Sequence, residues 1–242
     1  MTSAYNSSDS IHQQTHYGGG HRKRRPQRSR LSRKDKFLIA LIVIAVLGKF
    51  LLSFGIPGKA DADFLKKVTV PEWISVQLID VDGASRRGKE LKEFNDIVVH
   101  YVGNPGTTAQ QNRDYFNSSD SNVSSHFVIG LEGEIIQCVP LWEISSASNH
   151  RNSDTISIEV CHPDSTGQFT DASRRSLIRL CAWLCRTGDL SSSHIIRHYD
   201  VTGKRCPLYY VDHEDQWKKL KKEIQKELST EIQIRGCRSG IP

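Results

Sequence analysis

The chain has 242 residues, of which 25% are charged, and its formal net charge is +6 at pH 7. The positive charge is concentrated at the start, because residues 1–36 carry nine Lys and Arg against two acids, a net +7 that leaves −1 for the remaining residues. A domain that binds nucleic acid would carry its basic patch on the folded part. The distribution therefore argues against nucleic acid as a partner and favours membrane topology as the reason for the charge.

The first 56 residues predict a membrane anchor. Residues 1–36 are rich in Ser, Gln, His and Gly, show no apolar periodicity, and are predicted to form a disordered, basic cytoplasmic tail. Residues 37–56 are apolar except for Lys49, and as a helix they would span about 30 Å, the thickness of one hydrocarbon core. The preceding positive charge predicts a single-pass protein of the cell membrane, with the N-terminus inside and the rest of the chain outside.

A cleaved signal peptide is the alternative, because Ala60-Asp61-Ala62 resembles a small-residue cleavage site. The length of the apolar stretch and of the basic region favours the uncleaved anchor, and either alternative exports the remainder. Residues 57–67 are predicted as a linker, 68–228 as one folded domain and 229–242 as a C-terminal tail.

Within the domain, hydrophobic patterning predicts strands mixed with helices. The predicted strands are 96–101, 126–130, 135–139 and 155–160, and a hairpin at 131–134 joins the middle two. The predicted helices are 107–117, opening at Thr107 or Thr108; 171–187, capped by Thr170 and ended by Gly188; and 212–227. This composition argues for an α/β domain with a central mixed β-sheet flanked by helices.

The loop 198–207 gathers side chains that suit a metal. It offers the imidazole of His198, the thiol of Cys206 and the ammonium of Lys204. Imidazole and thiolate both suit Zn²⁺, and a catalytic zinc takes three protein ligands and leaves a fourth position for water. The best candidate for the third ligand is His100, near the end of a predicted buried strand.

The predicted strand 155–160 supplies a carboxylate near its end. Alternation along the strand places Ile156 and Ile158 on one face and Glu159 on the other. The Glu159 side chain is therefore expected to lie outside the apolar layer, where it can reach a bound water.

Four separated motifs occur in a specific order along the chain. They are the strand that carries His100, then Ser124-Ser125-His126-Phe127-Val128-Ile129, then Ile156-Ser157-Ile158-Glu159, and then His198-Tyr199-Asp200-Val201-Thr202-Gly203-Lys204-Arg205-Cys206-Pro207. Together they resemble the zinc-dependent N-acetylmuramoyl-L-alanine amidases of type 2, which are related to phage amidase-lysozymes and peptidoglycan recognition proteins. The resemblance covers roughly residues 68–224.

The resemblance implies a hydrolase of cell-wall peptidoglycan, with Zn²⁺ as cofactor. It would cut the amide bond between the lactyl group of N-acetylmuramic acid and L-alanine. His100, His198 and Cys206 would hold the zinc, which lowers the pKa of its water toward about 7. Glu159 would be the general base and later the acid, and Lys204 would neutralise the developing oxyanion.

The remaining polar side chains of the motifs leave several interpretations open. Some relatives use a tyrosine at the position of Ser125, which this chain lacks. His126 is structural, contacts substrate, or closes the zinc shell as a fourth ligand. His150 and Asn152 are candidates for substrate binding or for orienting a ligand histidine, as is Asp200. Three further histidines are predicted to be ordinary surface residues: His162, His194 and His213.

Two function classes remain, an enzyme and a non-catalytic module that binds muropeptides. Non-catalytic relatives usually lack the zinc cysteine, so the presence of Cys206 favours the enzyme. Zinc as a purely structural staple would need a fourth protein ligand that the motif does not require. The chain has five other cysteines, among which Cys181 and Cys185 lie on a predicted buried stripe, and no disulfide pairing is assigned.

Overall fold

Six strands form one mixed sheet in the computed structural model, which describes residues 32, 34, 62–81 and 85–239, with side chains up to residue 230. The spatial order of the strands is β1-β4-β3-β5-β2-β6, and only the β3–β4 hairpin is antiparallel. Their bounds are β1 Ser75–Val76, β2 Asp96–Tyr101, β3 Phe127–Ile129, β4 Ile135–Gln137, β5 Thr155–Val160 and β6 Ile195–Arg197. The predicted central mixed sheet flanked by helices is confirmed.

The two central strands separate apolar from functional side chains by simple alternation. Ile97 and Val99 of β2, with Ile156 and Ile158 of β5, are fully buried in the larger core. The residues between them point to the opposite face of the sheet. β2 and β5 pair in parallel in a register that sets His100 directly opposite Glu159. The prediction that Glu159 lies on the face opposite Ile156 and Ile158 is confirmed.

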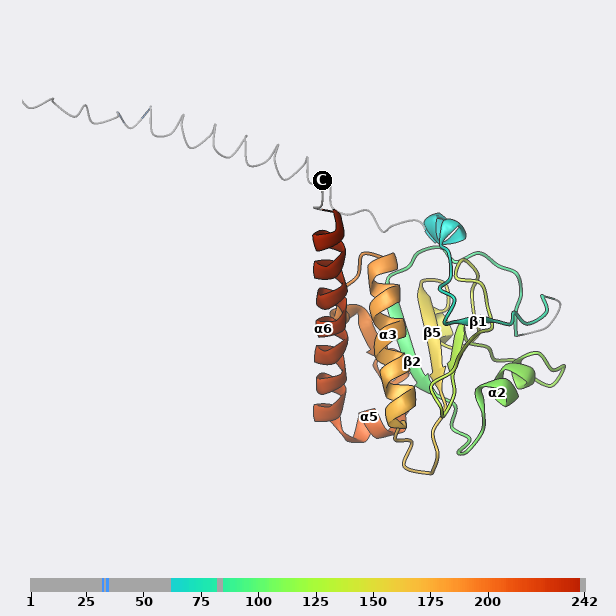
Figure 1. The fold of residues 1–242 in the computed structure, drawn as a ribbon. Coiled ribbons are helices and arrows are strands. Elements are labelled where there is room, and N and C mark those ends of the chain that lie inside the picture. Colours follow the sequence, from blue (N-terminus) through green and yellow to red (C-terminus); the bar gives the residue numbers. More distant parts are fainter. Residues whose placement is uncertain (1–31, 33, 35–61, 82–84, 240–242) are drawn as a thin grey trace, which may run out of the picture. The chain divides into compact units, whose positions relative to one another are not determined.

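Two long helices cover one face of the sheet and lie side by side (Figure 1). α3, Asp171–Thr187, begins after the N-cap Thr170 and ends at Gly188, as predicted. α6 spans Glu214–Ser239. Both helices bury an apolar stripe in the larger core: Leu177, Leu180, Cys181 and Leu184 from α3, and Trp217, Leu220, Ile224 and Leu228 from α6. Burying each of these side chains contributes about 1.5–3 kcal/mol.

The other face of the sheet carries α2, Ala109–Phe116, and a smaller apolar core (Figure 1). A capping box opens the helix, because Thr108 accepts from the Gln111 N–H and Gln111 accepts from the Thr108 N–H. The start at Thr108 was one of the two predicted. Because this core is small, the same face leaves room for a cleft beside it.

Short elements complete the domain. The 3₁₀ turns are η1 Ala62–Lys67, η2 Asn149–Arg151 and η3 Ser192–His194, and the short helices are α4 His198–Thr202 and α5 Leu208–Asp212. The five cysteines whose side chains are described are all free and buried: Cys138, Cys161, Cys181, Cys185 and Cys206.

Three predicted boundaries differ from those in the structure. The predicted linker 57–67 is not all linker, because its last part forms η1, in which Leu65 is fully buried in the core. The helix predicted at 212–227 is interrupted by His213, whose backbone leaves the helical region, and α6 then begins at Glu214. The predicted tail from residue 229 continues α6 as far as Ser239.

The helix runs past residue 229 although serine and threonine are weak helix formers. The Ser229 hydroxyl donates to the Gln225 carbonyl and the Thr230 hydroxyl to the Lys226 carbonyl, so both side chains bond within the helix. Among residues 62–81 and 85–239, no helix is both long and apolar enough to cross a membrane. The predicted anchor at 37–56 lies outside the described residues.

Candidate metal centre and cleft

Three potential metal ligands converge where two neighbouring parallel strands end. His100 lies in β2, and His198 follows β6 as the first residue of α4. Because Val99 pairs with Arg197, the register brings the two histidine rings to a centroid distance of 4.6 Å. Cys206 joins them from the following loop, and one ligand atom from each of the three lies within 4.8 Å of the others. All three side chains are buried.

The loop that returns Cys206 to the histidines is fixed by its backbone. Gly203 ends α4 with a φ of 78°, in the left-handed region that glycine adopts without steric cost. The Tyr199 N–H then donates to the Cys206 carbonyl at 2.8 Å. The Sγ of Cys206 consequently lies 3.9 Å from the Nδ1 of His100.

The protonation of the three side chains suits a metal. Burial, followed by the charges of His198 and Lys204, holds the pKa of His100 well below its usual range, and burial and Lys204 also lower the pKa of His198. Burial raises the pKa of the Cys206 thiol to about 12. Both imidazoles are therefore neutral at pH 7 with a lone pair to offer, and a cation is needed to displace the thiol proton. This donor set fits Zn²⁺.

Glu159 stands directly beside the three ligands. Its Oε1 lies 3.9 Å from the Nδ1 of His100, and its buried Oε2 has no hydrogen-bond partner among the described residues. Burial raises the pKa of Glu159 to about 8, although the charge of Lys204 opposes the shift. A carboxyl group with that pKa can take up and release a proton near neutral pH, which is what a general base and acid requires.

The raised pKa of Glu159 makes a prediction about the stability of the zinc-free protein. Between pH 4.5 and about 8 the folded state keeps the Glu159 proton and the unfolded state has lost it, so rising pH destabilises the fold by about 1.4 kcal/mol per unit. Glu159→Gln removes this dependence. The variant should therefore gain stability over wild type as pH rises toward about 8, and the difference should then level off.

Urea unfolding of both zinc-free proteins across this pH range measures the difference. The lowered pKa values of His100 and His126 act with the opposite sign at lower pH, but they are common to both proteins and cancel in the comparison. A stability difference that does not change with pH would contradict the burial of an ionisable Glu159.

A cleft of about 1650 Å³ opens above these residues. The three ligands, Glu159 and the exposed Lys204 all line it, and α2 contributes Tyr115 among other polar and aromatic side chains to its wall. The cleft therefore brings together all five residues predicted for metal binding and catalysis.

Three further polar residues of the predicted site lie in different surroundings. Asn152 lines the cleft, but its Oδ1 accepts the N–H groups of Ala147 and Ser148. His150 is exposed on η2 and is not among the residues that line the cleft. Asp200, predicted to orient a ligand histidine, instead accepts from the Arg197 guanidinium and backbone.

His126 does not bind substrate in this arrangement, which corrects that prediction. It is fully buried, its Nδ1 accepts the Ser157 N–H at 3.0 Å, and its Nε2 lies 2.9 Å from the Glu143 carbonyl. Because both ring nitrogens contact backbone groups, His126 is available neither to a ligand in the cleft nor to a metal. Burial lowers the pKa of His126 to about 4, which keeps the ring neutral. The structural role is the one that the geometry supports.

Sequence reasoning missed several supports of the site. Ser148 and Asn149 lie against the ligand histidines, although nothing in the spacing of residues marks them. His162 is buried, against the prediction of a surface residue, and its ring centroid lies 5.0 Å from that of Tyr101. His194 and His213 are exposed, as predicted.

Comparison with known proteins shows what the domain is similar to. Residues 91–208 match the sequence model of the family described as N-acetylmuramoyl-L-alanine amidase, Amidase_2. The chain is 28% identical over 163 residues to the N-acetylmuramoyl-L-alanine amidase CwlL of Bacillus licheniformis, covering 60% of this chain and 45% of that protein. It is 26% identical over 174 residues to BlyA of Bacillus subtilis strain 168, covering 62% and 46%. The match thus spans less than half the length of these curated relatives.

Solved structures agree with the sequence match. The catalytic domain of XlyA has a TM-score of 0.55 and 27% identity, and the match covers 62% of this chain and 98% of that domain. A mutant endolysin from Bacillus subtilis gives the same score and identity, with 62% and 97% covered. The matched residues 91–208 hold all three potential ligands, Glu159 and Lys204. Through these residues, which make up just under half of its length, the chain is similar to the N-acetylmuramoyl-L-alanine amidases.

Proposed function

We propose that this protein hydrolyses the amide bond between N-acetylmuramic acid and L-alanine in peptidoglycan, with Zn²⁺ as cofactor. One observation carries the proposal: an unpartnered, buried carboxyl oxygen of Glu159 stands beside three convergent metal ligands at the floor of an open cleft. The family match and the likeness to the catalytic domain of XlyA support it. The relatives named above are N-acetylmuramoyl-L-alanine amidases, which supplies the substrate class.

His100, His198 and Cys206 would hold the zinc, which when bound polarises a carbonyl oxygen and lowers the pKa of water toward about 7. Glu159 accepts the proton of the attacking water and returns it to the amide nitrogen as the carbon–nitrogen bond breaks. Its pKa of about 8 matches both halves of that task. Lys204 places a positive charge where the carbonyl oxygen becomes negative, a contribution of typically a few kcal/mol.

The test uses the purified full-length chain. Zinc per chain is measured, and the protein is incubated with peptidoglycan while newly exposed amino-terminal L-alanine is assayed. We expect one zinc per chain and a steady release of new alanine termini that stops when a chelator removes the metal. One zinc per chain with muropeptide binding and no new termini would overturn the hydrolase and leave the binding module.

We further propose that residues 37–56 anchor the protein in the cell membrane, with the basic tail inside and the amidase domain outside. The supporting observations are the length of the apolar stretch and the net charge of +7 before it. The protein should stay with membranes through an alkaline wash, and protease added to intact protoplasts should digest the domain. Release by the wash would contradict an uncleaved anchor.

A further inference from the structure

One short turn contacts both histidines of the candidate zinc site through their Nε2 atoms. The hydroxyl of Ser148 lies 3.3 Å from the Nε2 of His100, and the Oδ1 of Asn149 lies 2.9 Å from the Nε2 of His198. The two contacts come from adjacent residues. A single piece of backbone therefore touches ligands that belong to two different strands of the sheet.

These contacts decide which ring nitrogen is left for a metal. An amide oxygen only accepts hydrogen bonds, so the Nε2 of His198 must carry the proton and its Nδ1 must carry the lone pair. For His100, the Nδ1 is the nitrogen that faces the Sγ of Cys206. Both rings therefore have Nε2 at the turn, which leaves Nδ1 as the nitrogen available to a metal. The hydrogen bond at one nitrogen of a ligand histidine fixes its tautomer and orientation.

Hydrogen bonds and ion pairs hold the turn in this conformation. Asn152 closes it, because its Oδ1 accepts the N–H groups of Ala147 and Ser148 and its own N–H donates to the Asn149 carbonyl. Arg151 ties it to the sheet through ion pairs with Asp96 at the start of β2 and with Asp154. The position of Asn149 is thus set independently of the histidine that it contacts.

Asn149 has a φ of 54°, in the left-handed region that non-glycine residues rarely adopt. Asparagine tolerates this conformation better than most residues, and here it aims the side chain at His198. A strained backbone that persists at a functional site points to a role for the residue that bears it.

We propose that the Ser148–Asn149 turn is a positioning device that orients both zinc-ligand histidines and sets the tautomer of His198, with Asn149 as its principal positioning residue. The inference rests on the proposed function for the identity of the metal. Asn149 acts through His198 and holds the ring with its Nδ1 toward the centre. Asn152, which was predicted to bind substrate, closes this turn through its Oδ1.

Two substitutions separate the amide oxygen from the backbone conformation. Asn149→Gly keeps the left-handed turn, which glycine adopts freely, and removes the acceptor. Asn149→Asp keeps the acceptor and much of the tolerance of the left-handed region. Asp189→Gly is a matched control, because Asp189 also has a positive φ, 52°, and lies in the exposed loop after α3.

Zinc affinity is measured for the full chain by chelator competition, alongside thermal unfolding of the zinc-free proteins and the kcat and KM of the loaded ones. We expect Asn149→Gly to weaken zinc binding about 10–100-fold without lowering the Tm of the zinc-free protein. Asn149→Asp should bind zinc at least as tightly as wild type does. Asp189→Gly should have the zinc affinity of wild type.

The outcomes separate this inference from the proposed function. Unchanged zinc affinity in Asn149→Gly, with or without a raised KM, would overturn the positioning role, and the raised KM would assign Asn149 to the substrate. Weakened zinc binding in a protein that hydrolyses nothing would support the inference and overturn only the amidase. A wild-type chain that binds no zinc would overturn the metal site itself, and the inference with it.

Discussion

Glu159→Gln should lower the kcat for release of alanine termini by about 10²–10⁴-fold while leaving one zinc per chain. Glutamine has nearly the shape of glutamate but cannot take a proton from the attacking water. Zinc should remain because the potential metal ligands are His100, His198 and Cys206. The KM should change little, since the loss falls on proton transfer in the transition state. Single-turnover release of alanine termini, with zinc measured on the same samples, checks the prediction.

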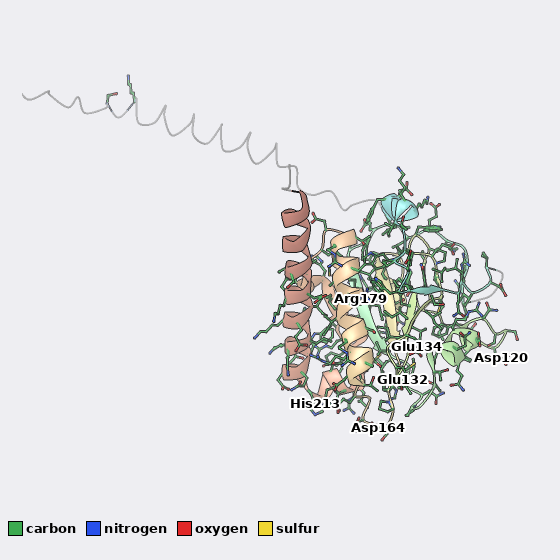
Figure 2. All side chains as sticks on the ribbon, viewed as in Figure 1. Asp120, Glu132, Glu134, Asp164, Arg179 and His213 are labelled. Carbon is green, nitrogen blue, oxygen red and sulfur yellow. The ribbon has the colours of Figure 1, made fainter. Side chains whose placement is uncertain are left out.

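Glu132→Gln is the matched control, because Glu132 is an exposed carboxylate in the β3–β4 hairpin (Figure 2). It makes the same chemical change away from the cleft lining and should leave kcat and zinc at wild-type values. Activity of Glu159→Gln within about threefold of wild type, well short of the range for a general base, would remove Glu159 from the catalytic machinery. Loss of zinc in that variant would instead make Glu159 a metal ligand.

Cys206→Ser should abolish zinc binding and activity together. A serine hydroxyl does not ionise at neutral pH, so the site loses the anionic ligand that two neutral imidazoles cannot replace. The loss of zinc affinity should exceed the roughly 10–100-fold that substitution of a residue behind a ligand costs. Metal analysis after dialysis, followed by the alanine-release assay, measures both effects.

Cys138→Ala serves as the control for removing a buried thiol. Cys138 belongs to the smaller core and is not one of the three convergent ligands, so the variant should lose some stability and keep its zinc. A Cys206→Ser protein that retains stoichiometric zinc would show that another residue completes the site. His126 is already engaged by the backbone, so such a result would require the site to rearrange.

Local patterning predicted the elements that carry the site. The alternation of Ile156, Ile158 and Glu159 was sufficient to place the carboxylate on the open face, because a strand leaves only two choices. The apolar stripe and the caps of α3 were equally local signals. The ligand set came from the order of motifs and the family resemblance, and the structure brings those three residues together.

The features that the sequence left open depend on contacts between distant segments. Nothing near His126 reveals that its ring bonds to Ser157 and Glu143, because these partners are 31 and 17 residues away. Asn149 gives no signal either, since its role depends on a positive φ and on a histidine 49 residues later. The pairing of β2 with both β5 and β6 is likewise a choice among strands that no local pattern makes.

The pairing of β2 with β5 and β6 also bears on when the candidate metal site can form during synthesis. His100 and Cys206 are 106 residues apart, and the strand that delivers His198 is the last of the sheet to leave the ribosome. Contacts of such long range form only after the intervening chain has been ordered. A nascent chain that ends before β6 lacks two of the three ligands. The candidate metal site therefore stays incomplete until nearly the whole domain has been made.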